Sequence, residues 1–351
     1  MSESIAGLIS DSPLDRPLAV AYAGRLARAL TSIALAGVAF ALTAGVLHQA
    51  VPQPVLPVVT PKLAYFLQHK DEFDAVFIGS SRICHGIVPA AFDETMRQHG
   101  VASHSFNLGV EEMFPPATFQ VLDTVLRSRP AHLKWVFLEE APIYLTDNEP
   151  TLRSIAWHDA PATALVAKVL VGKNGLRGVY KHSTDLFANV RICLLNLTNI
   201  GRVPAVLRPQ PDETQGATEY AGYMPLQGTH FENAAKAQKF QTDLATMYAK
   251  TPVPATEEPV SAEAFVKELQ KIKAAGAQPC LVIPPMPQRG GDFLGSKAGC
   301  PVLAFNDAVR YAQFFDLSNR FDGGHLNDTG AHAFSQVLAE VFAGKQLVGG
   351  K

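Results

Sequence analysis

The chain has 351 residues, of which 47% are hydrophobic and 18% charged, which suits one large domain or one domain with an elaborated insertion. Its formal net charge is −2 and it has no basic block, which argues against a nucleic-acid partner. The four cysteines match no close zinc-ligand spacing, and we expect neither a metal nor a cofactor. For Cys280 and Cys300 the sequence leaves two alternatives open: a disulfide, if the domain is extracytoplasmic, and buried free thiols.

An uncharged run of 19 residues between 29 and 47 is about long enough to cross a bilayer, and it predicts a transmembrane helix over residues 29–50. Three arginines precede this run, and no Lys or Arg follows it before Lys62. We therefore expect a single-pass type II protein of the cytoplasmic (inner) membrane, with the rest of the chain in the periplasm or extracytoplasmic space. A cleaved signal peptide and a buried helix of a soluble protein are the alternatives.

The domain organisation follows from this helix. Residues 1–28 form the predicted cytoplasmic arm. Residues 51–70 form a proline-rich exit linker that ends in a short helix over 61–69. Residues 71–351 form the extracytoplasmic domain.

Strands and helices alternate in this domain. Strands are predicted at 74–79, 103–108, 135–138, 278–283 and 314–317, and helices at 89–99, 116–127, 262–275 and 329–342. Such alternation predicts an α/β fold with a parallel sheet in three layers, α/β/α.

A middle segment at about 151–260 interrupts the alternation. It has helical stretches at 162–171, 184–197 and 231–248, a loop at 204–228 and a linker at 251–259. Because long insertions in compact domains are often functional, we expect it to cover the site as a lid and to bind substrate.

The strongest chemical signal is a serine after the first strand together with an Asp-x-x-His motif near the C-terminus. Ser81 follows the carboxyl end of a strand, where the functional residues of open α/β sheets gather. A serine hydroxyl is a weak nucleophile until a base accepts its proton, and His325 is the candidate base. One short turn can place the Asp322 carboxylate beside the His325 imidazole. Each motif alone is typical of a turn or polar loop; together they predict a catalytic triad.

These motifs resemble the conserved blocks of the SGNH, or GDSL-like, hydrolase superfamily. The matching residues are Gly79-Ser80-Ser81, Asn107-Leu108-Gly109, and the set Asp322, His325, Asn327 and Gly330. The resemblance covers roughly residues 74–342 apart from the insertion. It implies a three-layer α/β/α domain, Ser81 as nucleophile, and an oxyanion hole made by the backbone amides of Ser81 and Gly109.

The chain departs from the family pattern at two places. Ser80 stands where the family has Asp, and the run 138–141, Leu-Glu-Glu-Ala, replaces Gly-x-Asn-Asp. The family's Asn donor is therefore missing, and removal of one such donor costs about 100- to 1000-fold in rate. Either two amides suffice or another group contributes. Candidates for an auxiliary or substrate-binding role are Arg82, Asn107 and Asn327.

The Gly-Ser-Ser block, the single anchor and the missing third block resemble one membrane-tethered branch, which includes alginate O-acetylation proteins and the D-alanyl transfer protein of teichoic-acid modification. This resemblance implies a serine-dependent O-acyltransferase that adds an acyl group, with acetyl expected, to a surface polysaccharide or exopolysaccharide. It also implies a multi-spanning membrane-bound O-acyltransferase as partner. The alternatives are a carbohydrate esterase or deacetylase with the same triad, and a catalytically silent scaffold of a polysaccharide-synthesis complex.

Three further positions have two interpretations each. His85 lies one helical turn beyond Ser81, so it either faces the cleft or is a packed histidine. Glu139 and Glu140 end the third predicted strand, so one of them approaches the site or both lie at the surface. Asn196 begins a glycosylation sequon, which we expect to be unmodified.

Overall fold

The computed structural model describes residues 15–50, 54–143, 150–172, 175–203, 216–229, 231, 233–249, 259–287 and 294–349. The predictions for residues 1–14 of the arm and for the stretches 51–53, 204–215 and 251–258 lie outside the described residues.

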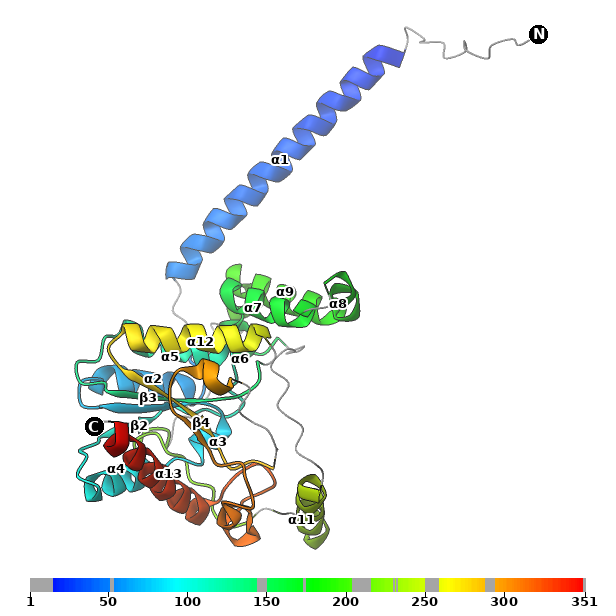
Figure 1. Ribbon diagram of the computed structural model, residues 1–351. Coiled ribbons are helices and arrows are strands. Elements are labelled where there is room, and N and C mark those ends of the chain that lie inside the picture. The colour runs from blue at the N-terminus through cyan, green and yellow to red at the C-terminus, as the bar shows by residue number, and fades with distance from the viewer. Residues whose placement is uncertain are drawn as a thin grey trace.

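A sheet of five parallel strands forms the centre of the domain (Figure 1). In spatial order the strands are β2 (Ser105–Asn107), β1 (Ala75–Ile78), β3 (Trp135–Glu139), β4 (Gln278–Ile283) and β5 (Val302–Ala304). Phe77 of β1 is in register with Asn107 of β2 and Phe137 of β3. Every residue of β1 and β3 is buried, which explains why these strands are continuous apolar runs. The predicted α/β class and parallel sheet are confirmed.

Helices pack on both faces of the sheet. One face is covered by α2 (Val59–His69), α5 (Ala117–Arg127) and α12 (Pro259–Ala274), and the other by α4 (Pro89–Gln98) and α13 (Asp328–Gly349). Because successive side chains of a strand point to opposite faces, Val76 and Ile78 join the first core and Ala75 and Phe77 the second. The short elements are α3 (Ser81–Cys84), η3 (Gly295–Ala298) and η5 (Leu317–Asn319).

The prediction of a last strand at 314–317 is wrong. Residues Ala312–Phe315 form a 3₁₀ helix, η4, and the fifth strand is β5. Phe314 is fully buried against Phe334 of α13, with ring centroids 5.5 Å apart. A short apolar run has the same appearance in a strand and in a buried helical turn, so its period could not separate the two.

The prediction that residues 51–70 are an exit linker also needs correction. Within this range α2 begins at Val59 and belongs to the folded domain, since Lys62 and Phe66 have no exposed surface. The amphipathic spacing of α2 buries one face against the sheet, so the domain begins earlier than residue 71.

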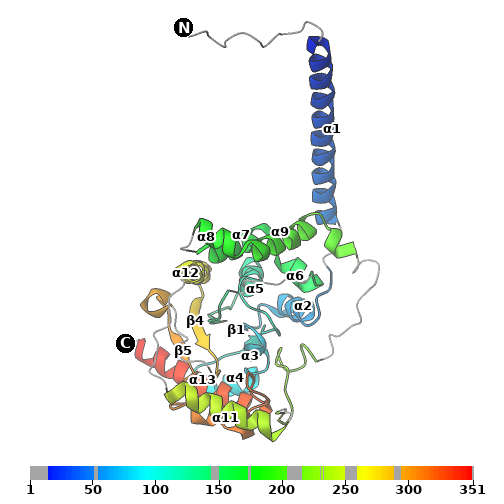
Figure 2. The ribbon, with the colours of Figure 1, turned by 90° about the vertical axis from the view of Figure 1, so that its right-hand side faces the viewer.

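The N-terminal helix α1 (Asp15–Ala50) projects away from the domain (Figures 1 and 2). Its portion Gly24–Ala50 is long and apolar enough to cross a membrane. Nearly all described side chains of this portion are exposed, so the alternative of a buried soluble helix is wrong. Helix α1 starts at Asp15, within the predicted arm of residues 1–28, and runs unbroken through the apolar stretch to Ala50.

The predicted insertion contains the expected helices, but they lie at two ends of the molecule. Helices α7 (Ala160–Val171), α8 (Leu176–Lys181) and α9 (Ser183–Leu197) lie between α1 and the layer of α5 and α12 (Figure 2). Helix α6 (Leu152–Trp157) lies beside α5, and η2 (Ile200–Arg202) follows α9. Helix α11 (Ala234–Ala249) lies at the end far from α1. The expectation of a lid therefore does not hold for residues 152–203.

No disulfide joins Cys280 and Cys300 in the structure, which decides between the two alternatives that the sequence left open. Cys280 is fully buried in β4, and burial raises the pKa of its thiol.

Candidate active site

Ser81 lies directly after the carboxyl end of β1. The turn requires Gly79, because a Cβ at this position would lie 2.5 Å from a carboxylate oxygen of Glu139. Ser80 then caps α3, and its Oγ accepts a hydrogen bond from the Arg82 amide at 3.3 Å. Ser81 is consequently the first residue of α3.

The structure brings Ser81, His325 and Asp322 together. His325 Nε2 lies 2.8 Å from Ser81 Oγ, and His325 Nδ1 lies 3.0 Å from each carboxylate oxygen of Asp322. A proton on Nδ1 is donated to the carboxylate, which leaves Nε2 as the acceptor for the serine hydroxyl. The three side chains thus form the hydrogen-bonded chain that general-base activation of a serine requires.

The Asp322 carboxylate is held in its charged form. Burial alone would raise its pKa, but the hydrogen bond from His325, the nearby imidazole charge and the amides of Gly324 and His325 outweigh burial. They lower the pKa of Asp322 from 3.8 to about 2. Asp322 Oδ1 accepts from the two amides at 2.7 and 2.8 Å, so the carboxylate also fixes the turn that presents the imidazole.

Arg320 shapes the same loop, and sequence reasoning missed it. Its guanidinium donates at 2.9, 2.9 and 3.0 Å to the carbonyl oxygens of Phe314, Asp322 and Gly323. It also lies over the rings of Phe240 and Phe315. Burial lowers the pKa of Arg320 to about 10, opposed by the charge of Asp322. The available sequence signal was an arginine two residues before Asp322, separated from it by one phenylalanine, Phe321.

Glu139 holds the turn that carries Ser81, so the interpretation of a surface pair is wrong. Its side chain is 1% exposed, and its carboxylate accepts from the Ser80 amide at 2.5 Å and from Ser80 Oγ at 3.1 Å. Arg82 Nε lies 3.1 Å from the same carboxylate, and Arg82 Nη1 contacts Met286 Sδ at 3.2 Å. Arg82 is therefore bound to β3, and this pairing explains why a carboxylate occupies the end of that strand.

The predicted second oxyanion donor is already engaged. The Gly109 amide donates to Asn107 Oδ1 at 2.8 Å, and Asn107 Nδ2 donates to the carbonyl oxygens of Ile83 and Ile87. Asn107 is fully buried, so neither group offers a free donor in this arrangement. Gly109 is instead required for close packing, because a Cβ there would lie 2.3 Å from the Cys84 amide nitrogen.

Asn327 has a structural position rather than the predicted contact with substrate. It is 5% exposed and directly precedes α13. Its Nδ2 donates to Ser318 O at 2.7 Å, and its Oδ1 accepts from the Gly330 amide at 2.9 Å. This is the pattern of an N-terminal helix cap, which satisfies amides that the first helical turn leaves unpaired.

His85 packs edge-on against His325, with ring centroids 5.9 Å apart. Its Nδ1 lies 2.7 Å from Met224 O and its Nε2 lies 3.0 Å from Glu111 Oε1. Both nitrogens therefore face acceptors, and the ring is fixed beside the triad. Met224 belongs to the predicted insertion, so this contact joins the insertion to the site.

Lys62 lies under the site with no exposed surface. Its Nζ donates to Gly109 O at 2.6 Å and to Cys84 Sγ at 3.4 Å. Burial lowers the pKa of Lys62 and raises the pKa of Cys84, although each partially offsets the shift of the other. Cys84 is thus a buried thiol of low reactivity, and Lys62 connects α2 to the strand end that carries Gly109.

A cavity of about 660 Å³ opens beside Asp322 and Gly323. Its other walls come from Pro287 and from residues of the α11 region, namely Phe231, Lys236, Lys239, Phe240, Asp243 and Met247. Part of the predicted insertion therefore does border the triad, as expected for a substrate-binding element.

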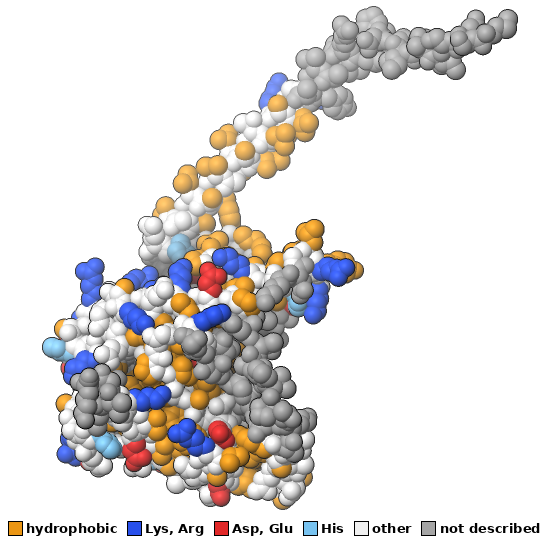
Figure 3. Space-filling view, in the orientation of Figure 1, with side chains coloured by type: hydrophobic (Ala, Val, Ile, Leu, Met, Phe, Trp, Pro, Cys, Tyr) orange, Lys and Arg blue, Asp and Glu red, His pale blue; other side chains and the backbone are white. Residues whose placement is uncertain are grey.

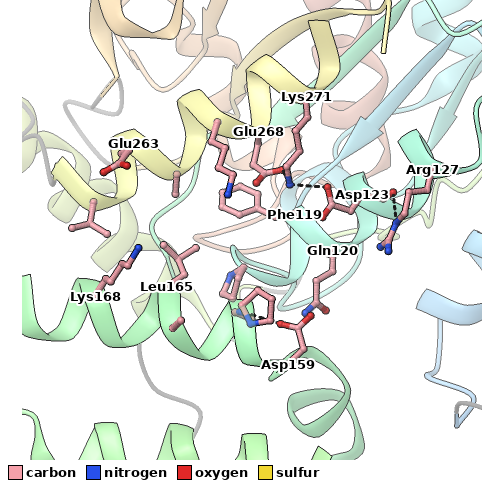
Figure 4. A pocket seen from close by; sticks show the side chains of 17 residues that line it. Phe119, Gln120, Asp123, Arg127, Asp159, Leu165, Lys168, Glu263, Glu268 and Lys271 are labelled. Atoms are coloured by element: carbon pink, nitrogen blue, oxygen red, sulfur yellow. Dashed lines mark hydrogen bonds and ion pairs between the residues drawn. The ribbon is translucent and has the colours of Figure 1, made fainter. Parts of the chain in front are cut away.

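A second cavity, of about 540 Å³, lies between α5, α7 and α12 (Figure 4). Lys271 projects into it and pairs with Asp123 and Glu268, each at 2.8 Å. No Ser, Cys or His is among its lining residues, so this cavity offers no nucleophile, whereas Asp322 of the Ser81–His325–Asp322 chain lines the other cavity. Among the described residues, no group of three or more His, Cys, Asp or Glu is arranged to hold a metal.

No protein-family model and no curated protein matches this chain. The functional assignment therefore depends on the geometry of its own residues.

Proposed function

We propose that this protein is a membrane-anchored, extracytoplasmic O-acyltransferase with an SGNH-like three-layer domain. It transfers an acyl group, with acetyl expected, to a hydroxyl of a cell-surface polysaccharide or exopolysaccharide through a serine acyl-enzyme. The observation that carries the proposal is the hydrogen-bonded chain from Ser81 through His325 to Asp322.

The chemistry follows from the positions of the protons. Ser81 Oγ attacks the carbonyl carbon of the acyl donor while its proton passes to His325 Nε2, and Asp322 stabilises the resulting imidazolium. The tetrahedral intermediate collapses, and the leaving group takes the proton from His325. A sugar hydroxyl then gives its proton to Nε2 and attacks the acyl carbon, and collapse returns the proton to Ser81 Oγ.

The Ser81 amide is the proposed oxyanion donor. It has no hydrogen-bond partner among the described residues, and it starts α3 beside the Oγ that it would assist. Gly109 joins it only when its amide leaves Asn107 Oδ1, since the two acceptors compete for one proton. We infer that binding of the acyl donor shifts the Asn107–Gly109 turn.

The cavity beside Asp322 is the proposed acceptor site. Its aromatic side chains Phe231 and Phe240 offer apolar faces to a sugar ring, and its wall includes polar side chains of α11. A partner is also expected, because a single helix gives no route for an acyl group across the membrane. A multi-spanning membrane-bound O-acyltransferase is the partner that the sequence resemblance implies.

Partial exposure of the triad favours a second candidate, a carbohydrate esterase or deacetylase. The His325 and Asp322 side chains are 28% and 38% exposed, so water can reach the acyl-enzyme unless substrate or a partner covers it. Hydrolysis uses the same residues, with water in place of the sugar hydroxyl.

The deciding experiment measures O-acyl esters on the surface polysaccharide of cells that contain the wild-type protein, Ser81→Ala or Ser183→Ala at matched levels. Ser183 is an exposed serine of α9 and serves as the control. Fewer esters in Ser81→Ala alone indicate a transferase, and more esters indicate a deacetylase. An unchanged ester content contradicts both candidates for that polymer. Fluorophosphonate labelling of the wild type but not of Ser81→Ala would argue against a silent scaffold.

A further inference from the structure

The outer face of α9 is apolar, unlike that of a helix on the surface of a soluble domain, and its buried face mixes the apolar Ile192 and Cys193 with polar side chains. Its exposed face carries Phe187, Val190, Leu194 and Leu197, with exposed fractions of 70%, 49%, 54% and 46%. These residues recur at spacings of three and four, so they share one side of the helix. The buried face includes two asparagines, Asn189 and Asn196.

The buried asparagines are hydrogen-bonded within the domain, so the inner face of α9 is fixed by polar as well as apolar contacts. Asn189 Oδ1 lies 2.9 Å from His158 Nε2, and Asn196 Nδ2 donates to Ile155 O at 2.6 Å. The sequon asparagine is therefore inaccessible to modification. Asn189 and Asn196 are thus hydrogen-bonded inside, while Phe187, Leu194 and Leu197 remain exposed.

The neighbouring elements extend the same apolar surface. Helix α8 adds Leu176 and Tyr180, which are 89% and 88% exposed, and the η2 region adds Ile200 and Val203. Outside α1, nine of the thirteen exposed large apolar side chains of the described domain lie in residues 176–203. Figure 3 shows apolar side chains along α1 and on the projecting edge of this region. We call the exposed apolar residues of 176–203 the apolar platform.

The platform touches α1 inside its apolar stretch. Asn199 Nδ2 donates to Ala44 O at 2.8 Å, and Asn199 Oδ1 lies 3.2 Å from His48 Nδ1. Ala44 precedes Leu47, the end of the uncharged run, by about 4.5 Å along the helix axis. The corner between α9 and η2 is therefore level with the last turn of the segment that crosses the membrane.

The charges beside the platform fit a lipid surface. Arg177, Lys181 and Arg191 are exposed on α8 and α9, whereas the one acidic residue of these two helices, Asp185, lies 3.3 Å from His182. An exposed apolar face flanked by basic side chains is typical of helices that lie in the membrane interface. Anionic headgroups attract such basic residues.

We propose that the apolar platform lies in the outer interface of the bilayer that α1 spans. The side chains of Phe187, Leu194 and Leu176 enter the upper part of the acyl chains, and the basic side chains contact phosphate groups. The domain is then held by two attachments, α1 and the platform, which fix its orientation relative to the membrane. This inference depends on α1 crossing the bilayer and is independent of the chemistry at Ser81.

The test uses the full-length chain, one copy per nanodisc, in anionic bilayers with and without lipids brominated near the top of the acyl chain. Phe187→Trp reports on the platform, and Val309→Trp, 76% exposed outside the platform, is the matched control. We expect bromolipids to remove roughly half or more of the emission added by Trp at 187, because interfacial helices insert by about 5–10 Å. The emission added at 309 should not change.

Equal quenching of the two variants would overturn the proposal. Equal quenching would be expected if this face instead binds a protein partner or a second copy of the chain. Neither is present in these nanodiscs, so the face would then stay in water. Leu176→Trp provides a second reporter on a different helix, so failure of one variant to fold does not decide the outcome.

Discussion

The end of the domain that carries Ser81 and the end next to α1 differ in which side chains they bury. At the triad end, charged groups such as Arg320, Glu139 and Lys62 are buried and each is bound to specific carbonyl, carboxylate or amide partners. At the α1 end, apolar side chains are exposed in a continuous group. One predicted insertion supplies residues to both ends. At the first end, buried and hydrogen-bonded charges mark the candidate site; at the second, exposed apolar side chains mark the surface that we propose faces the membrane.

The largest expected effect is at the nucleophile. Ser81→Ala should lower the turnover of an acyl-ester substrate by about 10⁴- to 10⁶-fold, because no other hydroxyl is bonded to His325 Nε2 among the described residues. Initial rates of release of the leaving group measure this change. Exposed residues of the platform should not share the effect, so an equal loss in Phe187→Ser would contradict the separation of the two ends.

Asp322→Asn should lower turnover by about 10⁴-fold, because the amide no longer fixes the productive tautomer of His325. It should also change the pH dependence of stability. Since the folded-state pKa of Asp322 is about 2, below its value in the unfolded chain, its stabilising contribution is full above about pH 4 and is lost as pH falls through 2. Thermal unfolding of both proteins between pH 6 and pH 2 should show their difference shrinking, and a constant difference would contradict this origin.

Arg320→Met should reduce turnover by roughly 10- to 100-fold through misplacement of the Asp322–His325 loop, as is typical for loss of a supporting hydrogen-bond partner. It should also lower the free energy of unfolding by about 1–3 kcal/mol, because buried carbonyl groups lose their donor. Arg127→Met, at the exposed end of α5, is the control. A loss of stability with unchanged turnover would show that Arg320 does not position the triad.

The smallest effect is expected at the platform. Phe187→Ser should change the free energy of unfolding in mild detergent by less than about 0.5 kcal/mol, because the side chain is mostly exposed. Phe77→Ser, in the centre of the sheet, should cost about 3–5 kcal/mol by comparison. Denaturant unfolding of both variants gives the two values. A large cost at Phe187 would mean that the platform packs against another part of the chain.

The sequence predicted features that depend on local pattern. The apolar run before Gly79 fixed β1, the Gly-Ser-Ser turn placed Ser81 at the start of α3, and Asp-x-x-His set the carboxylate beside the imidazole. Each of these three features involves only a few consecutive residues, so the spacing of residues along the chain is enough to predict it. The contact between Ser81 and His325 spans 244 residues, and it was predicted only from the combination of the two motifs and their resemblance to the SGNH blocks.

The features that sequence reasoning missed depend on tertiary burial. Lys62 looked like part of a linker, and nothing in its neighbours indicates that its Nζ reaches Gly109 across the fold. A sequence motif also could not show that the Gly109 amide donates to Asn107 Oδ1, because the motif is the same whether or not that amide is free. The platform was missed because its helices have ordinary composition, and only the direction of their burial is unusual.

The layer of α5 and α12 has a consequence for how substrate arrives. This layer separates the α7–α9 helices from the sheet (Figure 2). Packed helices are 8–10 Å apart, so in the proposed orientation two such layers set the sheet about 20 Å above the bilayer. Ser81 follows a strand of that sheet and would then lie beyond reach of the headgroups. The proposed acyl transfer would therefore need a carrier or a partner protein that extends about that far from the membrane.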